Sequence, residues 1–105
     1  MIRINFYQHN QQLCGCSVSG HAGYADSGQD VVCAGVSTAV QMTANMLTEI
    51  FKIPADISVD ENRIGIRLPD PLPSEGVKIM DGLELQIQQI KEEFPRFIQI
   101  KHTEV

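Results

Sequence analysis

The chain has few basic residues and no long apolar run. Only 8 of its 105 residues are Lys or Arg, against 13 Asp or Glu, which gives a formal net charge of −5. The basic residues are scattered, whereas a nucleic-acid-binding protein would show a basic face, so we expect no direct nucleic-acid partner. No uninterrupted apolar run approaches the roughly 18 residues of a membrane span. The first residues also lack the apolar core of a signal peptide, so we expect no membrane association.

Cysteine is scarce as well. The chain has three cysteines, an odd number that is too small for a disulfide framework. This usage is typical of a reducing compartment, so we expect a cytoplasmic protein with reduced thiols. Cys14 and Cys16 are too closely spaced for a zinc ribbon and have no second pair, so we expect both in the core and no metal. Phosphate-binding glycine motifs are also missing, and the sequence implies no cofactor.

What is present is ordinary for one soluble domain over residues 1–105, with 43% hydrophobic and 20% charged residues. Periodicity predicts the elements in the order ββαββαβ. This order indicates an α+β, two-layer domain: a mostly antiparallel sheet with two helices on one face. The predicted strands cover residues 2–7, 14–19, 57–59, 64–68 and 97–101, and the predicted helices run from 31 to before Pro54 and from 74 to Pro95.

Each predicted helix has an apolar stripe at steps of three and four residues. In the first helix the stripe is Val36, Val40, Thr43, Leu47 and Ile50. In the second helix it is Met80, Leu83, Ile87, Ile90 and Phe94.

The residues best suited to chemistry lie between Gly20 and Ser37. His21 is in a glycine-rich loop, and Cys33 follows twelve positions later in the first turn of the helix that Asp30 is predicted to cap. The positive end of a helix dipole favours a thiolate, and a histidine titrates where a general base is needed at neutral pH. Backbone N–H groups at this helix start, those of Val32 and Cys33 among them, are candidate donors to an oxyanion.

Each of these residues also has a plain structural interpretation. Most free cysteines are small buried hydrophobes, and most loop histidines are simply exposed. Asp30 could cap the helix, orient His21 or contact a substrate amide, and we favour the cap. His9 and His102 are expected at the surface. The rival functions are a non-catalytic α+β dimeric binding module, and a redox or thioesterase activity of the same pair.

The segment resembles the ribosomal-processing cysteine proteases, the Prp family. The residues that carry the resemblance are Gly20-His21, Asp30-Val31-Val32-Cys33 and Ser37. It implies a cytoplasmic, homodimeric cysteine endopeptidase with Cys33 as nucleophile and His21 as base. The implied substrate is the precursor of a large-subunit ribosomal protein, which loses an N-terminal extension during ribosome assembly.

The resemblance also bears on the residues around this pair. It gives Asp30, Ser37 and Gly20 supporting or substrate-contacting roles, and it implies that the glycine-rich loop opens and closes over the substrate. The alternative is a non-catalytic binding or assembly module of the ribosome.

Overall fold

The computed structural model describes residues 1–20 and 27–105, with side chains from residue 31 onward in the second range. The elements follow the predicted order, with one additional π-helical segment, η1, directly after the first helix. They are β1 (Ile2–His9), β2 (Gln12–Ser19), α1 (Ser27–Asn45), η1 (Met46–Ile50), β3 (Asp56–Asp60), β4 (Arg63–Arg67), α2 (Ser74–Glu93) and β5 (Ile98–Glu104).

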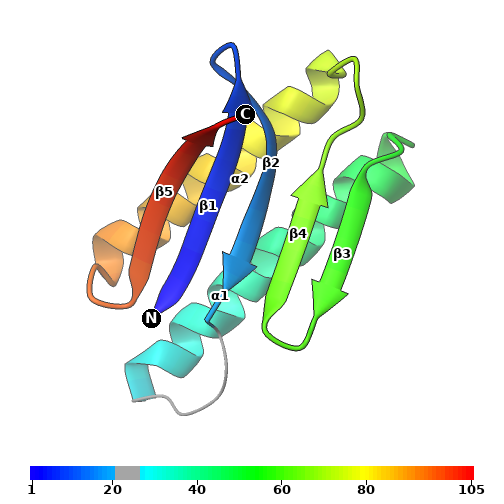
Figure 1. The fold of residues 1–105 in the computed structure, drawn as a ribbon. Coiled ribbons are helices and arrows are strands. Elements are labelled where there is room, and N and C mark those ends of the chain that lie inside the picture. Colours follow the sequence, from blue (N-terminus) through cyan, green and yellow to red (C-terminus); the bar gives the residue numbers. More distant parts are fainter. Residues whose placement is uncertain (21–26) are drawn as a thin grey trace.

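The strands form one five-stranded sheet in the order β3-β4-β2-β1-β5. Three of the neighbouring pairs are antiparallel, and β5 pairs with β1 in parallel, with Ile2 opposite Ile98. Both helices pack on one face of the sheet, and no described helix covers the other face (Figure 1). The two-layer α+β fold with a mostly antiparallel sheet is therefore confirmed.

The core lies between the sheet and the two helices. The even-numbered residues of β1 point toward the helices, and the odd-numbered ones point to the open face, because successive side chains of a strand alternate. The apolar stripes of the helices meet this side of the sheet. Fully buried members of the core include Ile2, Ile4 and Phe6 of β1, Val36 and Val40 of α1, Leu47 of η1, and Met80 and Ile87 of α2.

The end of the first helical stripe was predicted wrongly. Ile50 is 65% exposed, although its spacing from Leu47 predicted burial. The reason is η1, where the N–H of Phe51 donates to the carbonyl of Met46, five residues back (N···O 2.9 Å). A turn with this wider spacing rotates the following residues around the axis, so the three-and-four pattern no longer holds.

The stretch Val31–Ile50 is long and apolar enough, by length and composition alone, to cross a membrane. A core helix of a soluble protein passes the same test. Here 28% of the stretch is buried inside the domain, and its buried residues, which include Val36, Val40 and Leu47, belong to the hydrophobic core.

A β-bulge separates the two cysteines of β2. The register between β1 and β2 shifts after the pair Tyr7–Gly15, and the next pair is Gln8–Leu13, so Cys14 has no partner on β1. The extra residue moves Leu13 to the buried face. Cys16 is in the core as predicted, whereas Cys14 is only partly buried and that prediction was wrong.

The buried Cys16 predicts a pH dependence of stability. Burial raises the pKa of the Cys16 thiol from 9.0 to about 12. Below pH 9 the thiol is neutral in both states and has no effect. Between pH 9 and 12 the Cys16 thiol ionises in the unfolded chain but stays neutral in the folded one. Its contribution therefore lowers the free energy of unfolding by about 1.4 kcal/mol per pH unit. Urea unfolding at pH 8 to 11 should show this fall, and Cys16→Ala should reduce its slope. Parallel curves for the two proteins would contradict the assignment.

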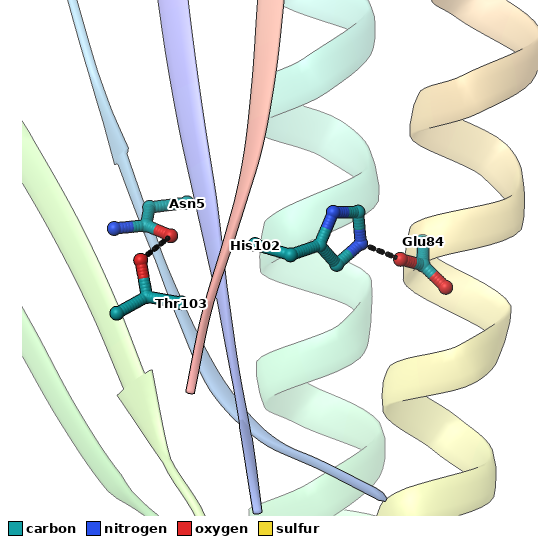
Figure 2. A network of polar contacts seen from close by, with 4 residues as sticks. All are labelled: Asn5, Glu84, His102 and Thr103. Carbon is teal, nitrogen blue, oxygen red and sulfur yellow. Dashed lines mark hydrogen bonds and ion pairs between the residues drawn. The ribbon is translucent and has the colours of Figure 1, made fainter. Parts of the chain in front are cut away.

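The edge strand β5 is tied to both layers of the domain. On the helix side, His102 bonds to Glu84 of α2 and stacks on Phe6 with ring centroids 5.6 Å apart. On the open face, the hydroxyl of Thr103 donates to Oδ1 of Asn5 (2.9 Å). Figure 2 shows the two contacts on opposite sides of the strand. The strand runs to Glu104, three residues past its predicted end, because it keeps its register with β1 as far as Gln8.

Candidate active site

The helix that carries Cys33 begins earlier than predicted. α1 starts at Ser27, so Asp30 is its fourth residue and not its N-cap. Acidic residues are favoured throughout the first turn of a helix, as well as at the cap, because of the helix dipole. None of Ser27, Gly28 and Gln29 is a proline, so the helix can extend through them. Each added residue contributes one backbone hydrogen bond. The interpretation of Asp30 as a cap was therefore wrong, and its side chain lies outside the described part of the chain.

This start changes the electrostatic setting of Cys33. The thiol belongs to the seventh helical residue, in the second turn, whereas the dipole acts mainly within the first. The backbone N–H groups of Val32 and Cys33 lie in the helix interior, where each bonds to a carbonyl four residues back. They are therefore not available to an oxyanion, and the prediction that they donate to one was wrong. Within α1, the N–H groups without an intrahelical partner are those of its first three residues, 27–29.

Cys33 and Ser37 lie on one side of α1, and α2 lies on another. A Cβ atom added to Gly35 would be 3.7 Å from Ile90 of α2, which identifies the side of α1 that faces its neighbour. At 100° per residue, Cys33 is about 160° from Gly35 and only about 40° from Ser37. Both side chains are partly buried, and Cys33 packs against the core cluster. The predicted proximity of Cys33 and Ser37 on one side of the helix is confirmed, and this side turns away from α2.

Gly20 has a strict backbone role at the end of β2. Its φ of +84° lies in the left-handed region that favours glycine, and an added Cβ would be 2.2 Å from the carbonyl oxygen of Met1. Another residue would require the backbone to move. Gly20 therefore fixes where the chain leaves the sheet, directly before His21 in the sequence. The supporting or substrate-contacting role of Gly20 stays a prediction.

The pairing of His21 with Cys33 stays a prediction. His21 and the segment expected to close over a substrate lie outside the described residues. Among the described side chains, no three His, Cys, Asp or Glu residues are grouped so that they could hold a metal ion.

The other two histidines are at the surface, as expected, and each has a structural contact. His9 donates from Nδ1 to the carbonyl oxygen of Val105 (2.8 Å), and His102 bonds to Glu84. Sequence reasoning missed both contacts, since they join positions far apart in the chain.

Comparison with known proteins gives one consistent result. The model of the family described as "Cysteine protease Prp" matches residues 1–99. The chain is 29% identical over 87 residues to the ribosomal processing cysteine protease Prp of Staphylococcus aureus, covering 81% of this chain and 82% of the relative. It is 26% identical over 92 residues to the protein of the same name from Bacillus subtilis, covering 82% of each.

Solved structures share the fold. The essential ribosomal processing protease Prp of S. aureus, in complex with a substrate peptide, superposes with a TM-score of 0.91 at 24% identity. That match covers 98% of this chain and all of the other. A protein from Streptococcus mutans superposes with a TM-score of 0.90 at 25% identity, over 100% of this chain and 96% of its own.

Proposed function

Because the chain belongs to the cysteine protease Prp family, we propose that it removes the N-terminal extension from the precursor of a large-subunit ribosomal protein. Cys33 is the nucleophile and His21 the general base in this proposal. The observation that carries it is the family match over residues 1–99, which includes the whole segment from Gly20 to Ser37. The relatives of the same length are named for ribosomal processing, which supports the substrate class.

The reaction follows from thiol chemistry. His21 takes the proton of the Cys33 thiol, and the thiolate attacks the carbonyl carbon of the scissile bond. The tetrahedral intermediate collapses to a thioester, the C–N bond breaks, and the leaving amine receives the proton from His21. Water, deprotonated by His21, then attacks the thioester and releases the new carboxylate and the thiol. These steps need neither a metal nor an organic cofactor, and they use no nucleic acid.

The position of Cys33 supports this role. A helix in the core of the domain carries the residue, and a nucleophile on such an element is held more precisely than one on a loop. The Cα–Cβ bond of a helical residue tilts toward the helix N-terminus, so the Cys33 side chain is directed toward the first turn. The N–H groups of that turn, at residues 27–29, have no intrahelical partners. We assign the oxyanion-stabilising role to this turn, in place of Val32 and Cys33.

We also propose that the protein is a cytoplasmic homodimer. The support for a dimer is an apolar groove of about 470 Å³ between α1 and α2, whose lining includes Ala39, Met42 and Leu83. Met42 and, on the same helix, Val31 are more than 60% exposed. The support for a cytoplasmic location is that Cys14 and Cys16 are reduced thiols.

A cleavage assay tests the proposed function. The purified protein is mixed with a peptide that spans the extension and the first mature residues of the precursor from the same genome, and the products are identified by mass spectrometry. We expect one cut that yields the mature N-terminus. Binding of the peptide without any cleavage would contradict the proposal and would favour the non-catalytic assembly module.

A further inference from the structure

The open face of the sheet gathers basic residues from three strands. Arg3 of β1, Arg63 of β4 and Lys101 of β5 line one surface cavity of about 420 Å³. Besides the buried Ile4, the rest of the lining is polar and neutral, and no described carboxylate contributes to it. These neutral residues are Asn5, Ser17, Ser19 and Gln99. An acidic chain has thus collected three cations around one cavity.

The strand register explains how distant positions meet here. Arg3 is opposite Ser19 on β2, and Ser19 is opposite Arg63 on β4. Lys101 is opposite Asn5, two residues along β1 from Arg3. With neighbouring strands about 4.8 Å apart and about 3.3 Å per residue along a strand, Arg3 and Arg63 are separated by roughly 10 Å, and Arg63 and Lys101 by roughly 16 Å. Arg3 and Arg63 share one cross-strand row, whereas Lys101 lies two residues further along, so the three cations do not converge on a single point.

These three cations are without carboxylate partners in the described part of the chain. The two ion pairs found there are Arg67–Asp56, at 3.7 Å, and the pair between His102 and Glu84. Arg67 lies on the same face but is balanced by Asp56. Asp60 is opposite Arg63 in the register of β3 and β4, yet the two form no ion pair.

A neutral donor adds to this site. Thr103 donates to Oδ1 of Asn5 (2.9 Å), which engages the acceptor end of the amide (Figure 2). The side-chain N–H groups of Asn5 are donors, as are the hydroxyl of Ser19 and the amide of Gln99. The hydroxyl of Ser17 is buried and bonds to that of Tyr7 (3.3 Å). The face therefore presents cations and neutral hydrogen-bond donors together, a combination that suits the oxygens of an anion.

From this arrangement we propose that the open face binds an RNA strand through its phosphates, without reading its sequence. Cations spread over the face in this way match a polymer with repeated charges better than one small anion. Release of counterions from the nucleic acid adds a driving force that an acidic polypeptide does not supply to the same degree. The cavity also lacks exposed apolar side chains to order such a polypeptide, since Ile4 is buried. The net charge of −5 suggested no nucleic-acid partner. It is a sum over the whole chain, however, and does not show that cations gather on one face of the sheet.

The test measures binding of a fluorescein-labelled 12-nucleotide oligouridylate by anisotropy, at 50 to 200 mM salt. The variant is Arg3→Gln/Arg63→Gln/Lys101→Gln. The control, Lys52→Gln/Lys78→Gln/Arg96→Gln, removes the same charge from exposed positions outside the cavity. We expect affinity at 50 mM salt to fall at least about tenfold in the variant and less than about threefold in the control. In the cavity variant the slope of log K against log salt should become less negative by about 2, since each of the three phosphate contacts to a single strand contributes roughly 0.7.

Three results would overturn the proposal. The first is no binding of the oligouridylate by the wild-type protein at 50 mM salt. The second is an equal loss of affinity in both triple variants, with both shown to be folded by thermal unfolding. The third is binding of polyglutamate as tight as that of the oligouridylate and equally sensitive to the cavity variant, which would identify an acidic-polypeptide site. None of these outcomes depends on the cleavage assay.

Discussion

Cys33→Ala is expected to lower kcat/KM for cleavage of the precursor peptide by at least about 10⁴-fold. Alanine has no nucleophilic atom, so no thioester can form, whichever base is present. The substitution removes one sulfur atom from a side chain that is only partly buried, so the fold should be retained with a loss of about 1 kcal/mol or less. The inactive variant should still bind the peptide, which isothermal titration calorimetry can measure.

Cys14→Ala is the matched control for this change. Cys14 is also partly buried, but it lies at the β-bulge of β2 and not on α1. We expect its cleavage rate to stay within about twofold of the wild type. Cleavage that survives Cys33→Ala would place the nucleophile elsewhere. An equal loss in both variants would show that the effect comes from the fold and not from the chemistry.

His21→Ala should have the second-largest effect, a fall in kcat/KM of about 10²- to 10⁴-fold, as is usual for loss of a general base. The pH profile distinguishes this role from a structural one. Activity of the wild type should rise across the range in which a histidine loses its proton, near pH 6 to 7. The variant should lose this rise and gain activity only at higher pH, where the thiol ionises without help.

His9→Ala is the control for the second prediction, since His9 is exposed and its ring bonds to the carbonyl oxygen of Val105, directly after β5. It should keep both the rate and the pH profile of the wild type. A pH profile unchanged in His21→Ala would remove His21 from the mechanism, even if the rate were lower.

The sequence allowed the layers of this domain to be predicted because each element carries its own periodicity. The alternation of Ile2, Ile4 and Phe6 and the stripe from Val36 to Leu47 depend only on local geometry and on burial of apolar surface. The family resemblance was available for a similar reason, since its residues all lie within one short segment, from Gly20 to Ser37.

Local deviations from regular geometry could not be predicted in the same way. The bulge at Cys14 and the π-helical turn at Met46–Ile50 each change the phase of a pattern without an evident residue signal. The start of α1 was ambiguous because Ser27 and Asp30 are both residues found at helix N-termini. This single difference of four residues, a start at 27 in place of 31, moved Cys33 from the first turn to the second and reassigned the oxyanion donors.

Contacts across the sheet also could not be predicted from the sequence. Whether Arg3, Arg63 and Lys101 share a face depends on strand order and register, which place residues 3 and 63 in one cross-strand row and residue 101 two residues further along. The parallel pairing of β5 with β1 is equally a property of the assembled sheet. Net charge summed along the chain could not reveal either feature.

The most direct test of the catalytic pair is the rate at which iodoacetamide alkylates Cys33 at pH 7, followed by peptide mass mapping. In the wild type we predict that Cys33 reacts at least about ten times faster than Cys14, while the buried Cys16 stays unmodified. In His21→Ala we predict that the rate at Cys33 falls to about that of Cys14. A Cys33 that reacts no faster than Cys14 in the wild type, or at the same rate with and without His21, would contradict the account.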